Sequence, residues 1–242
     1  MKATEATFEV IEALSQRGKG RVTELDLPKS IVHRHLSTLE DLEYIANEGG
    51  AYRLGFRFLK LGERARTRSE AYQLAGQKVD DLAEETGECA QFIVHEYRKG
   101  VYVFRAAGER AVQTDSEVGK RIPLHATAAG KAILTHLPRE RTAAIVDCHG
   151  LEPVTPNTMT EKGNLLDELE VILEQRYSIN NQENTEGLRA VGVPVQHGSG
   201  AVIGALSVPG PTHWFSDKFV AESLPTLLLG AANELALNIQ YT

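Results

Sequence analysis

Apolar residues recur at helical spacing in two segments near the start of the chain, residues 4–17 and residues 29–39. In the second segment Val32, Leu36 and Leu39 fall at i, i+4 and i+7, which predicts one apolar stripe along a short helix. Two short β-prone runs follow on either side of a glycine-rich turn, a pattern typical of a hairpin. Helices followed by such a hairpin predict a winged helix-turn-helix.

The polar side of the second helix suits double-stranded DNA. Pro28 can begin this helix, because its fixed φ fits a first turn and its missing N–H is not needed there. No carboxylate occurs before Glu40, and the exposed positions are Lys29, Ser30, His33, Arg34 and Ser37. Short donors and cations without acid groups match a polyanion whose base edges can be read.

Most of these positions have an expected role in a major groove. Lys29 and Ser30 would contact phosphate in the first turn, where backbone N–H groups already favour an anion. Ile31 has no polar group, so a thymine methyl is its expected contact, and His33 could reach a base edge. Arg34 could serve a phosphate or a guanine. The simpler alternative is an ordinary amphipathic helix whose histidines have no role.

A helical pattern extends from Gly55 to about Glu85, with Gly62 and Gly76 as candidate break points. We assign residues 55–86 to a linker that also contributes to a dimer. Its first turns supply candidate dimer contacts, which could instead pack within the monomer: Phe56, Phe58, Leu59 and Leu61. A basic run further along is better explained by solvation than by phosphate contact: Arg64, Arg66 and Arg68.

From residue 87 the pattern changes to paired β-rich runs. Residues 89–95 and 100–105 form one pair, residues 188–196 and 201–208 form another, and each pair is joined by a short turn. Helical patterns lie between the pairs and close the chain, over residues 126–137, 139–147, 164–175 and 216–240. Antiparallel hairpins with helices between them indicate an α+β fold.

Charge divides the chain at a similar place. Residues 1–68 carry 12 Lys and Arg against 10 Asp and Glu, whereas the remaining residues carry 14 against 23. Only the N-terminal part could therefore lie against phosphate at modest electrostatic cost. No stretch approaches the roughly 20 apolar residues of a membrane span, and the first residues lack a signal-peptide layout. Cys89 and Cys148 form neither a disulfide framework nor a C-x-x-C pair, which favours a cytoplasmic protein.

Several segments in order resemble the IclR family of bacterial and archaeal transcriptional regulators. They match the family's recognition helix, wing, effector-domain motif and later strands: Leu27–Arg34, Tyr52–Gly55, Leu124–Ala132, Glu186–Arg189 and Ser207–Gly210. The resemblance implies a winged helix-turn-helix DNA-binding domain in residues 1–54, with Arg53 of the wing as a further DNA contact. It also implies a GAF-like effector-binding domain in residues 87–242, and homodimers that often pair as tetramers.

One feature departs from the family. Its members usually have a fuller helix just before the recognition helix, whereas Thr23–Asp26 leaves room for about one turn. The recognition helix would then lack part of its support. We therefore expect either a deleted loop or residues missing between Val22 and Leu27.

Small residues over positions 119–132 indicate an effector site. They leave room for a ligand beside the backbone, and the helix start at Ala126–Ala129 offers N–H groups suited to a carboxylate. Close helix–sheet packing would explain them as well, and His125 could equally be a buried structural residue. The resemblance implies a ligand between this helix start and the sheet, which gives these candidates: Gly119, Leu124, His125, Ala128, Ala129, Asn180, Ala190 and Ser207.

The side chains at three matching positions make this pocket less polar and less acidic than the family pattern. The resemblance suggests Asp, Cys and Ser where this chain has Asn180, Ala190 and Pro209. We therefore expect an aromatic or aliphatic carboxylate as effector, larger or more apolar than a small oxoacid.

The sequence as a whole predicts a ligand-responsive, sequence-specific transcription regulator that needs no cofactor and is not an enzyme. A hydrolase or metal-dependent enzyme would have to use scattered histidines and cysteines that match no catalytic spacing. A metal-sensing regulator would keep the DNA-binding half and use the histidines as metal ligands. A third alternative uses the winged helix for protein contacts.

Overall fold

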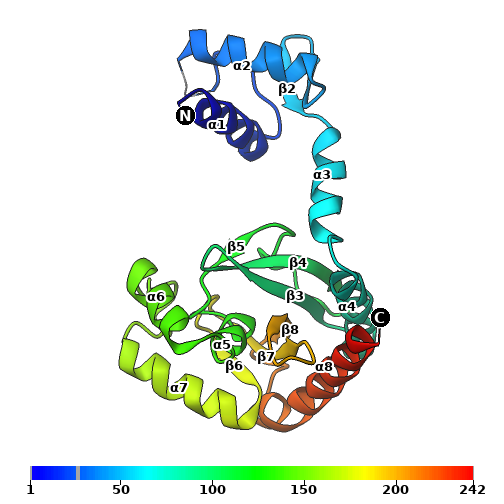
Figure 1. Ribbon diagram of the computed structural model, residues 1–242, viewed down its shortest axis with the longest axis vertical. Coiled ribbons are helices and arrows are strands. Elements are labelled where there is room, and N and C mark those ends of the chain that lie inside the picture. Colours follow the sequence, from blue (N-terminus) through cyan, green and yellow to red (C-terminus); the bar gives the residue numbers. More distant parts are fainter. Residues whose placement is uncertain (1, 26–27, 242) are drawn as a thin grey trace. The chain divides into compact units, whose positions relative to one another are not determined.

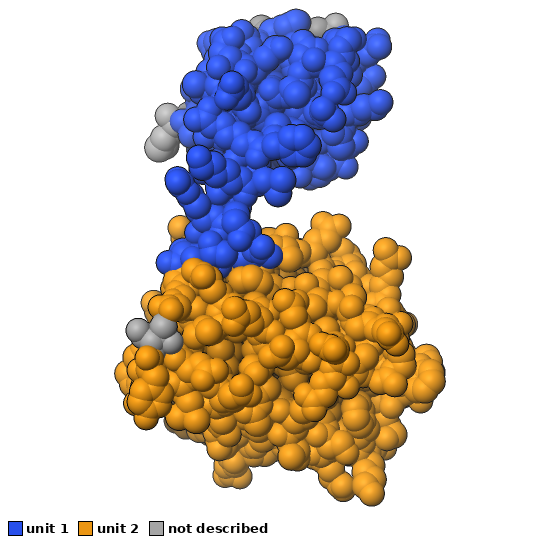
Figure 2. Space-filling model, turned by 90° about the vertical axis from the view of Figure 1, so that its right-hand side faces the viewer, with its two compact units in different colours: residues 1–68 blue, residues 69–242 orange. Residues whose placement is uncertain are grey.

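The computed structural model describes residues 2–25 and 28–241, with the side chains of Lys2, Lys29, Ser30, Ile31 and His149 left aside. The chain divides into two compact units, residues 1–68 and residues 69–242 (Figure 2). Each unit has its own apolar core, so each is described by itself.

The first unit consists of helices and one hairpin (Figure 1). In chain order they are α1 (Lys2–Arg17), α2 (Lys29–Asp41), β1 (Ile45–Glu48), β2 (Ala51–Leu54) and α3 (Arg57–Arg66). The apolar stripes of the first two helices share one core with residues of the connection and the hairpin: Val10, Leu14, Leu25, Val32, Leu36, Leu39 and Ile45. β1 and β2 pair antiparallel, and Tyr52 of β2 also pairs with Gly20.

The connection between α1 and α2 contains no helix within residues 18–25. Its backbone turns back on itself, because the Glu24 N–H donates to the Arg21 carbonyl at 2.9 Å and the Arg21 N–H donates to Glu24 Oε2 at 2.7 Å. Leu25 then packs into the core. The predicted deletion or gap between Val22 and Leu27 falls partly on Asp26 and Leu27, which lie outside the described residues.

The helical pattern from Gly55 to Glu85 is two helices, with the break at residues 67–69 and not at either glycine. Ser69 ends the continuity, because it adopts an extended backbone and its side chain caps α4 (Glu70–Thr86) by accepting from the Tyr72 N–H. Gly76 lies inside α4. A glycine is needed there because a β-carbon would stand 2.6 Å from the Phe104 ring.

The second unit is built on a six-stranded antiparallel sheet in the order β5-β4-β3-β8-β7-β6. The strands are β3 (Cys89–Glu96), β4 (Lys99–Ala107), β5 (Arg121–Ile122), β6 (Ser178–Asn181), β7 (Leu188–Gln196) and β8 (Val202–Pro211). The hairpins β3–β4 and β7–β8 and the α+β class are as predicted. The edge strands β5 and β6 were missed, since runs this short show no clear alternation.

Helices cover both faces of this sheet (Figure 1). One face carries α4 and α8 (Leu224–Gln240), the latter preceded by the π-helical turn η1 (Phe219–Ser223). The other carries α5 (Ala128–Leu134), with α7 (Lys162–Gln175) beside it and α6 (Arg139–His149) completing the same core. Neighbouring residues of β8 point into different cores, Leu206 toward α8 and Ala205 toward α5. No helix in the described ranges is long and apolar enough to span a bilayer.

Leu36→Ala tests the core of the first unit. Its side chain is fully buried, so we expect a loss of about 2–5 kcal/mol in the unfolding free energy of residues 1–68. Urea titration followed by circular dichroism measures this loss. The fluorescence of Trp214, which lies in the second unit, should keep its own midpoint. Leu42→Ala is the control, because 49% of Leu42 is exposed and its loss should stay within about 0.5 kcal/mol. Equal losses in the two variants would contradict the assignment of this core.

Candidate effector site and nucleic-acid interface

A cavity of about 320 Å³ lies in the second unit, against the start of α5 and the strands that face it. The sheet contributes residues that share one face of neighbouring strands: Gln91, Ile93, Tyr102, Asn180, Ala190 and Ser207. The start of α5 contributes Thr127, Ala128 and Ala129. The irregular connection from β4 to β5 supplies a further wall, which includes Thr114, Asp115, Ser116 and Lys120.

The start of α5 is fixed by a cap and by close packing. Thr127 has an extended backbone, and its hydroxyl accepts from the Gly130 N–H at 3.2 Å, as an N-cap residue does. A β-carbon at Gly192 of β7 would stand 2.6 Å from the Ala129 nitrogen, so only glycine lets the helix approach the sheet this closely. Small residues here therefore serve close packing, and Ala128 and Ala129 also border the cavity.

Five of the eight predicted effector positions line this cavity: Ala128, Ala129, Asn180, Ala190 and Ser207. The structure places Gly119, Leu124 and His125 outside it. Gly119 has φ +88° and donates its N–H to the Tyr102 carbonyl, so it serves a turn. Leu124 and His125 instead border a smaller cavity of about 120 Å³.

His125 has the structural role that its sequence context left open. Its Nε2 lies 3.1 Å from the Glu152 carbonyl oxygen, which fits an imidazole N–H that donates to the backbone. Burial lowers the pKa of this imidazole below its usual value, and a neutral ring follows near neutral pH. The side chain thus ties the start of the α5 segment to the loop after α6.

Asn180 braces the cavity wall through both ends of its amide. Its Nδ2 donates to the Ala126 carbonyl, and its Oδ1 accepts from the Glu183 N–H at 3.1 Å. An aspartate at this position could accept from Glu183 but could not donate to Ala126. The amide that makes the pocket less acidic therefore also links β6 to the segment just before α5.

A buried lysine, which sequence reasoning missed, stands behind this wall. Lys131 of α5 is fully buried, and its Nζ donates to Glu183 at 2.7 and 2.9 Å, to Glu168 at 2.6 Å and to the Ile179 carbonyl at 2.8 Å. Three donors on one ammonium thus join α5, α7 and β6. Burial raises the pKa of Glu183, and the attraction of Lys131 opposes that rise. In the sequence, the sign of this cluster is a lysine, Lys131, inside an otherwise apolar helical segment.

The cavity also has polar and cationic walls that the sequence did not identify. Lys120 pairs with Asp115, and Arg121, which also borders the space, pairs with Glu96 at 3.0 Å. Burial raises the pKa of Tyr102 to about 12, so its hydroxyl stays protonated and can donate. Finding these wall residues from the sequence would require knowing which strands pair and in which register, and the sequence does not give that.

Helix α2, the predicted recognition helix, exposes the side that the sequence predicts. His33, Arg34 and Ser37 are exposed, while Val32 and Leu36 of the same helix are buried. Lys29, Ser30 and Ile31 occupy the first turn of α2, and their side chains lie outside the described part.

Two residues near this surface have partners of their own. Arg53 of the hairpin is half exposed and pairs with Glu48 at 2.6 Å. His35 is buried, with Nδ1 2.9 Å from the Thr7 hydroxyl, so it contributes to the contact between α1 and α2.

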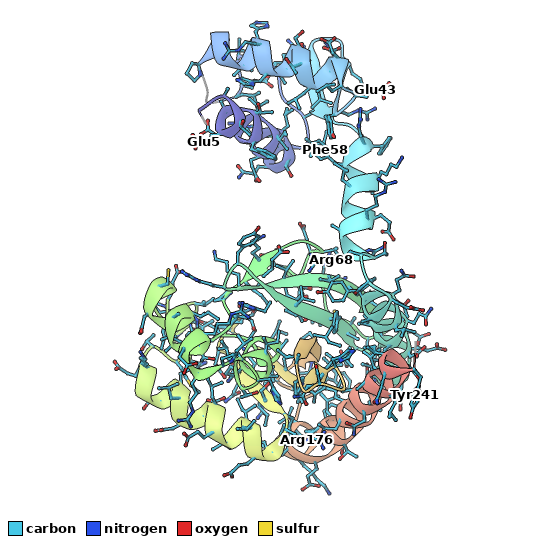
Figure 3. The ribbon with its side chains drawn as sticks, viewed as in Figure 1. Glu5, Glu43, Phe58, Arg68, Arg176 and Tyr241 are labelled. Atoms are coloured by element: carbon cyan, nitrogen blue, oxygen red, sulfur yellow. The ribbon has the colours of Figure 1, made fainter. Side chains whose placement is uncertain are left out.

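The apolar residues of the linker divide between the monomer core and the surface. Phe58 of α3 is labelled in Figure 3. It packs against Tyr44, with 5.1 Å between ring centroids. Phe56, Leu59 and Leu61 are 81%, 67% and 46% exposed. The expected alternative of packing within the monomer therefore holds for Phe58, and the other three remain available to a second copy.

Comparisons with known proteins agree on one class of protein. The family model described as bacterial transcriptional regulator IclR, C-terminal, matches residues 64–237. A probable HTH-type transcriptional regulator, ArcR, of Halobacterium salinarum is 30% identical, over 96% of this chain and 91% of that protein. The structure of the Thermotoga maritima IclR superposes with a TM-score of 0.82 at 26% identity, over 98% and 97% of the two chains.

These matches define a transcriptional regulator, and the chain belongs to the IclR family. The same fold occurs in an IclR homologue of Microbacterium hydrocarbonoxydans solved with 4-hydroxybenzoate, with a TM-score of 0.86 at 22% identity over 99% and 100% of the chains. Among the described residues, no group of three or more His, Cys, Asp or Glu side chains could hold a metal ion.

Lys131→Met tests the buried ion cluster. Removal of the ammonium leaves Glu183 buried without its cation, which should cost about 3–5 kcal/mol of unfolding free energy. Burial raises the pKa of Glu183 and Lys131 opposes that rise, so the variant should have the higher Glu183 pKa. A native-state pKa raised above the unfolded value costs stability as pH rises through it. The variant's loss should therefore be larger at about pH 8 than at about pH 5.

Urea unfolding monitored by Trp214 fluorescence at the two pH values measures this difference. Lys162→Met is the matched control, because its ion pair with Asp147 is exposed on both sides and should contribute at most about 1 kcal/mol. A loss from Lys131→Met that is the same at both pH values would contradict the role given to Glu183.

Proposed function

We propose that this regulator binds a DNA operator through α2 and the β1–β2 hairpin, and that an organic acid in the cavity beside α5 controls the binding. The observation that carries the proposal is the 320 Å³ cavity, placed at the start of α5 in a chain of a transcription-regulator family. A cavity of this size is typical of a small-molecule site.

The exposed side of α2 supports the DNA-binding half of the proposal. A first turn without acid groups and exposed His33, Arg34 and Ser37 can enter a major groove while Val32 and Leu36 hold the helix to the core. Lys29, Ser30 and Ile31 would lie at the leading end, and Arg53 would reach the backbone from the wing. Arg53 would then exchange Glu48 for a phosphate.

The walls of the cavity favour a carboxylate with an apolar body. Alanines and strand aliphatics offer apolar contact, while Lys120, paired with Asp115, and Arg121, paired with Glu96, place hydrogen-bond donors at one side. Gln91 and Tyr102 can hydrogen-bond a polar group at the sheet. The relative solved with 4-hydroxybenzoate supports an acid of this kind as effector.

Control of DNA binding would act through a homodimer. Exposed Phe56, Leu59 and Leu61 of the α3 segment can bring two copies together, and a dimer places two recognition helices on paired half-sites. Effector binding would shift the population of relative placements of the two DNA-binding units, which changes affinity for the operator. Two such dimers could then associate as a tetramer. Free Cys89 and Cys148 suit a reducing cytoplasm.

Arg34→Ala tests the DNA-binding face. The variant should bind upstream operator DNA about 1–3 kcal/mol more weakly if Arg34 contacts a guanine, and this loss should fall mainly on specific DNA. Gel-shift titration against operator and unrelated DNA measures both affinities. Arg139→Ala, with a side chain 92% exposed in the second unit, should leave both unchanged. Unchanged operator affinity in Arg34→Ala would count against α2 as the recognition helix.

Calorimetric titration tests the class of effector. We expect 4-hydroxybenzoate or a similar aromatic acid to bind more tightly than glyoxylate or pyruvate, because only the larger acids fill the apolar walls. Ala190→Leu should weaken that binding, since its side chain would occupy part of the cavity. Ala201→Leu, in the exposed β7–β8 turn, is the control. Tight glyoxylate or pyruvate binding without affinity for larger acids would refute this effector class.

A further inference from the structure

A second, smaller cavity of about 120 Å³ lies in the effector unit, next to the tip of the β3–β4 hairpin and the end of α6. Its inner walls are apolar and include Leu124, Leu134, Ile145 and Val146. Its rim carries three cationic residues, Arg98, Lys99 and Arg121. An apolar pocket with a cationic rim has the chemistry that recognises a carboxylate on a short hydrocarbon chain.

The tip of the β3–β4 hairpin has a backbone conformation that is unfavourable for its residues. Tyr97 and Arg98 have φ of 47° and 66°, the left-handed pair that such turns normally fill with asparagine and glycine. Large side chains at both positions are unfavourable for the turn itself. Residues held in this way often mark a functional constraint. Here Arg98 borders the cavity, and Tyr97 lies under Arg121, which borders it too.

The charges around the rim leave Arg98 and Lys99 without a carboxylate. Among the described residues, neither has a salt bridge, and Arg98 donates to the Cys148 thiol at 2.7 Å. Arg121 pairs with Glu96 and lies over the Tyr97 ring, 5.4 Å from its centroid. Arg98 and Lys99 therefore have spare capacity for an anion.

Opposing charges nearby are few or already engaged. Asp147 pairs with Lys162 at 2.6 Å. Glu152 borders the cavity, and its backbone carbonyl is the acceptor for His125. His125 itself is buried and hydrogen-bonded. Three cations against Glu96 and Glu152 leave the rim with a net positive charge.

We propose that this cavity is a second ligand site, distinct from the effector cavity, for a small aliphatic monocarboxylate. Its volume is about a third of that of the effector cavity, so an aromatic acid suits the larger space and a chain of a few carbons suits this one. Arg121 and Pro123 border both cavities. The two ligands would thus meet the same wall from opposite sides, and occupancy of one site would affect the other.

Cys148 reports on this site, because it is exposed and its sulfur contacts Arg98. Iodoacetate and iodoacetamide alkylate the same thiol and differ in charge, so the ratio of their rates cancels changes in the thiol itself. In the full-length protein we expect this ratio to fall about two- to fivefold in Arg98→Gln, the range for an exposed ion pair. Peptide mass spectrometry separates Cys148 from buried Cys89.

Matched variants and a competitor complete the experiment. Arg98→Lys keeps the charge and should keep most of the ratio, and Arg139→Gln, at the far end of α6, should leave it unchanged. Sodium butyrate should slow alkylation of Cys148 by iodoacetamide in the wild type, while butyramide should not. A ratio unchanged in Arg98→Gln would overturn the proposal. So would a lower ratio without protection by butyrate, because that result shows a charge effect on the thiol and no bound acid.

Discussion

A single ammonium group in the apolar core of the second unit holds the candidate site together. Lys131 is fully buried, and Glu183, Glu168 and the Ile179 carbonyl take up its donors. A buried charge without such partners would be strongly unfavourable, so α5, α7 and β6 have one arrangement in which all partners are in place. Asn180 extends that arrangement to the Ala126 carbonyl at the cavity wall.

The cavity beside α5 follows from this arrangement and from the pleat of the sheet. Alternate residues of β7 and β8 face α5, and among them Ala190 and Ser207 border the space while Gly192 admits the helix backbone. The intervening Val191 and Leu206 are buried toward α8. Each of these strands therefore packs on both faces, and its small residues face α5 because close approach of the helix and an open cavity both need them.

The first unit has a small core that holds α2 by one side. Its core must fix α2 while leaving the other side of that helix free, and a stripe of three residues with α1 and the hairpin achieves this. The connection before α2 turns back on itself within residues 21–25, and Leu25 fills part of the core. Net charge follows the same division of labour, with the acid excess confined to residues beyond 68.

The sequence by itself determined what depends on neighbours along the chain. Helical stripes, the turns of both β-hairpins in the second unit, the α+β class and the exposed side of α2 follow from spacing, and ordered motifs indicated the family. The tertiary structure decided what depends on pairing across the chain. The short strands β5 and β6, the link from Asn180 to Ala126 and the partners of Lys131 join residues far apart in sequence. The displacement of Leu124 and His125 from the effector cavity has the same cause, since the direction of a side chain is set by packing against the sheet.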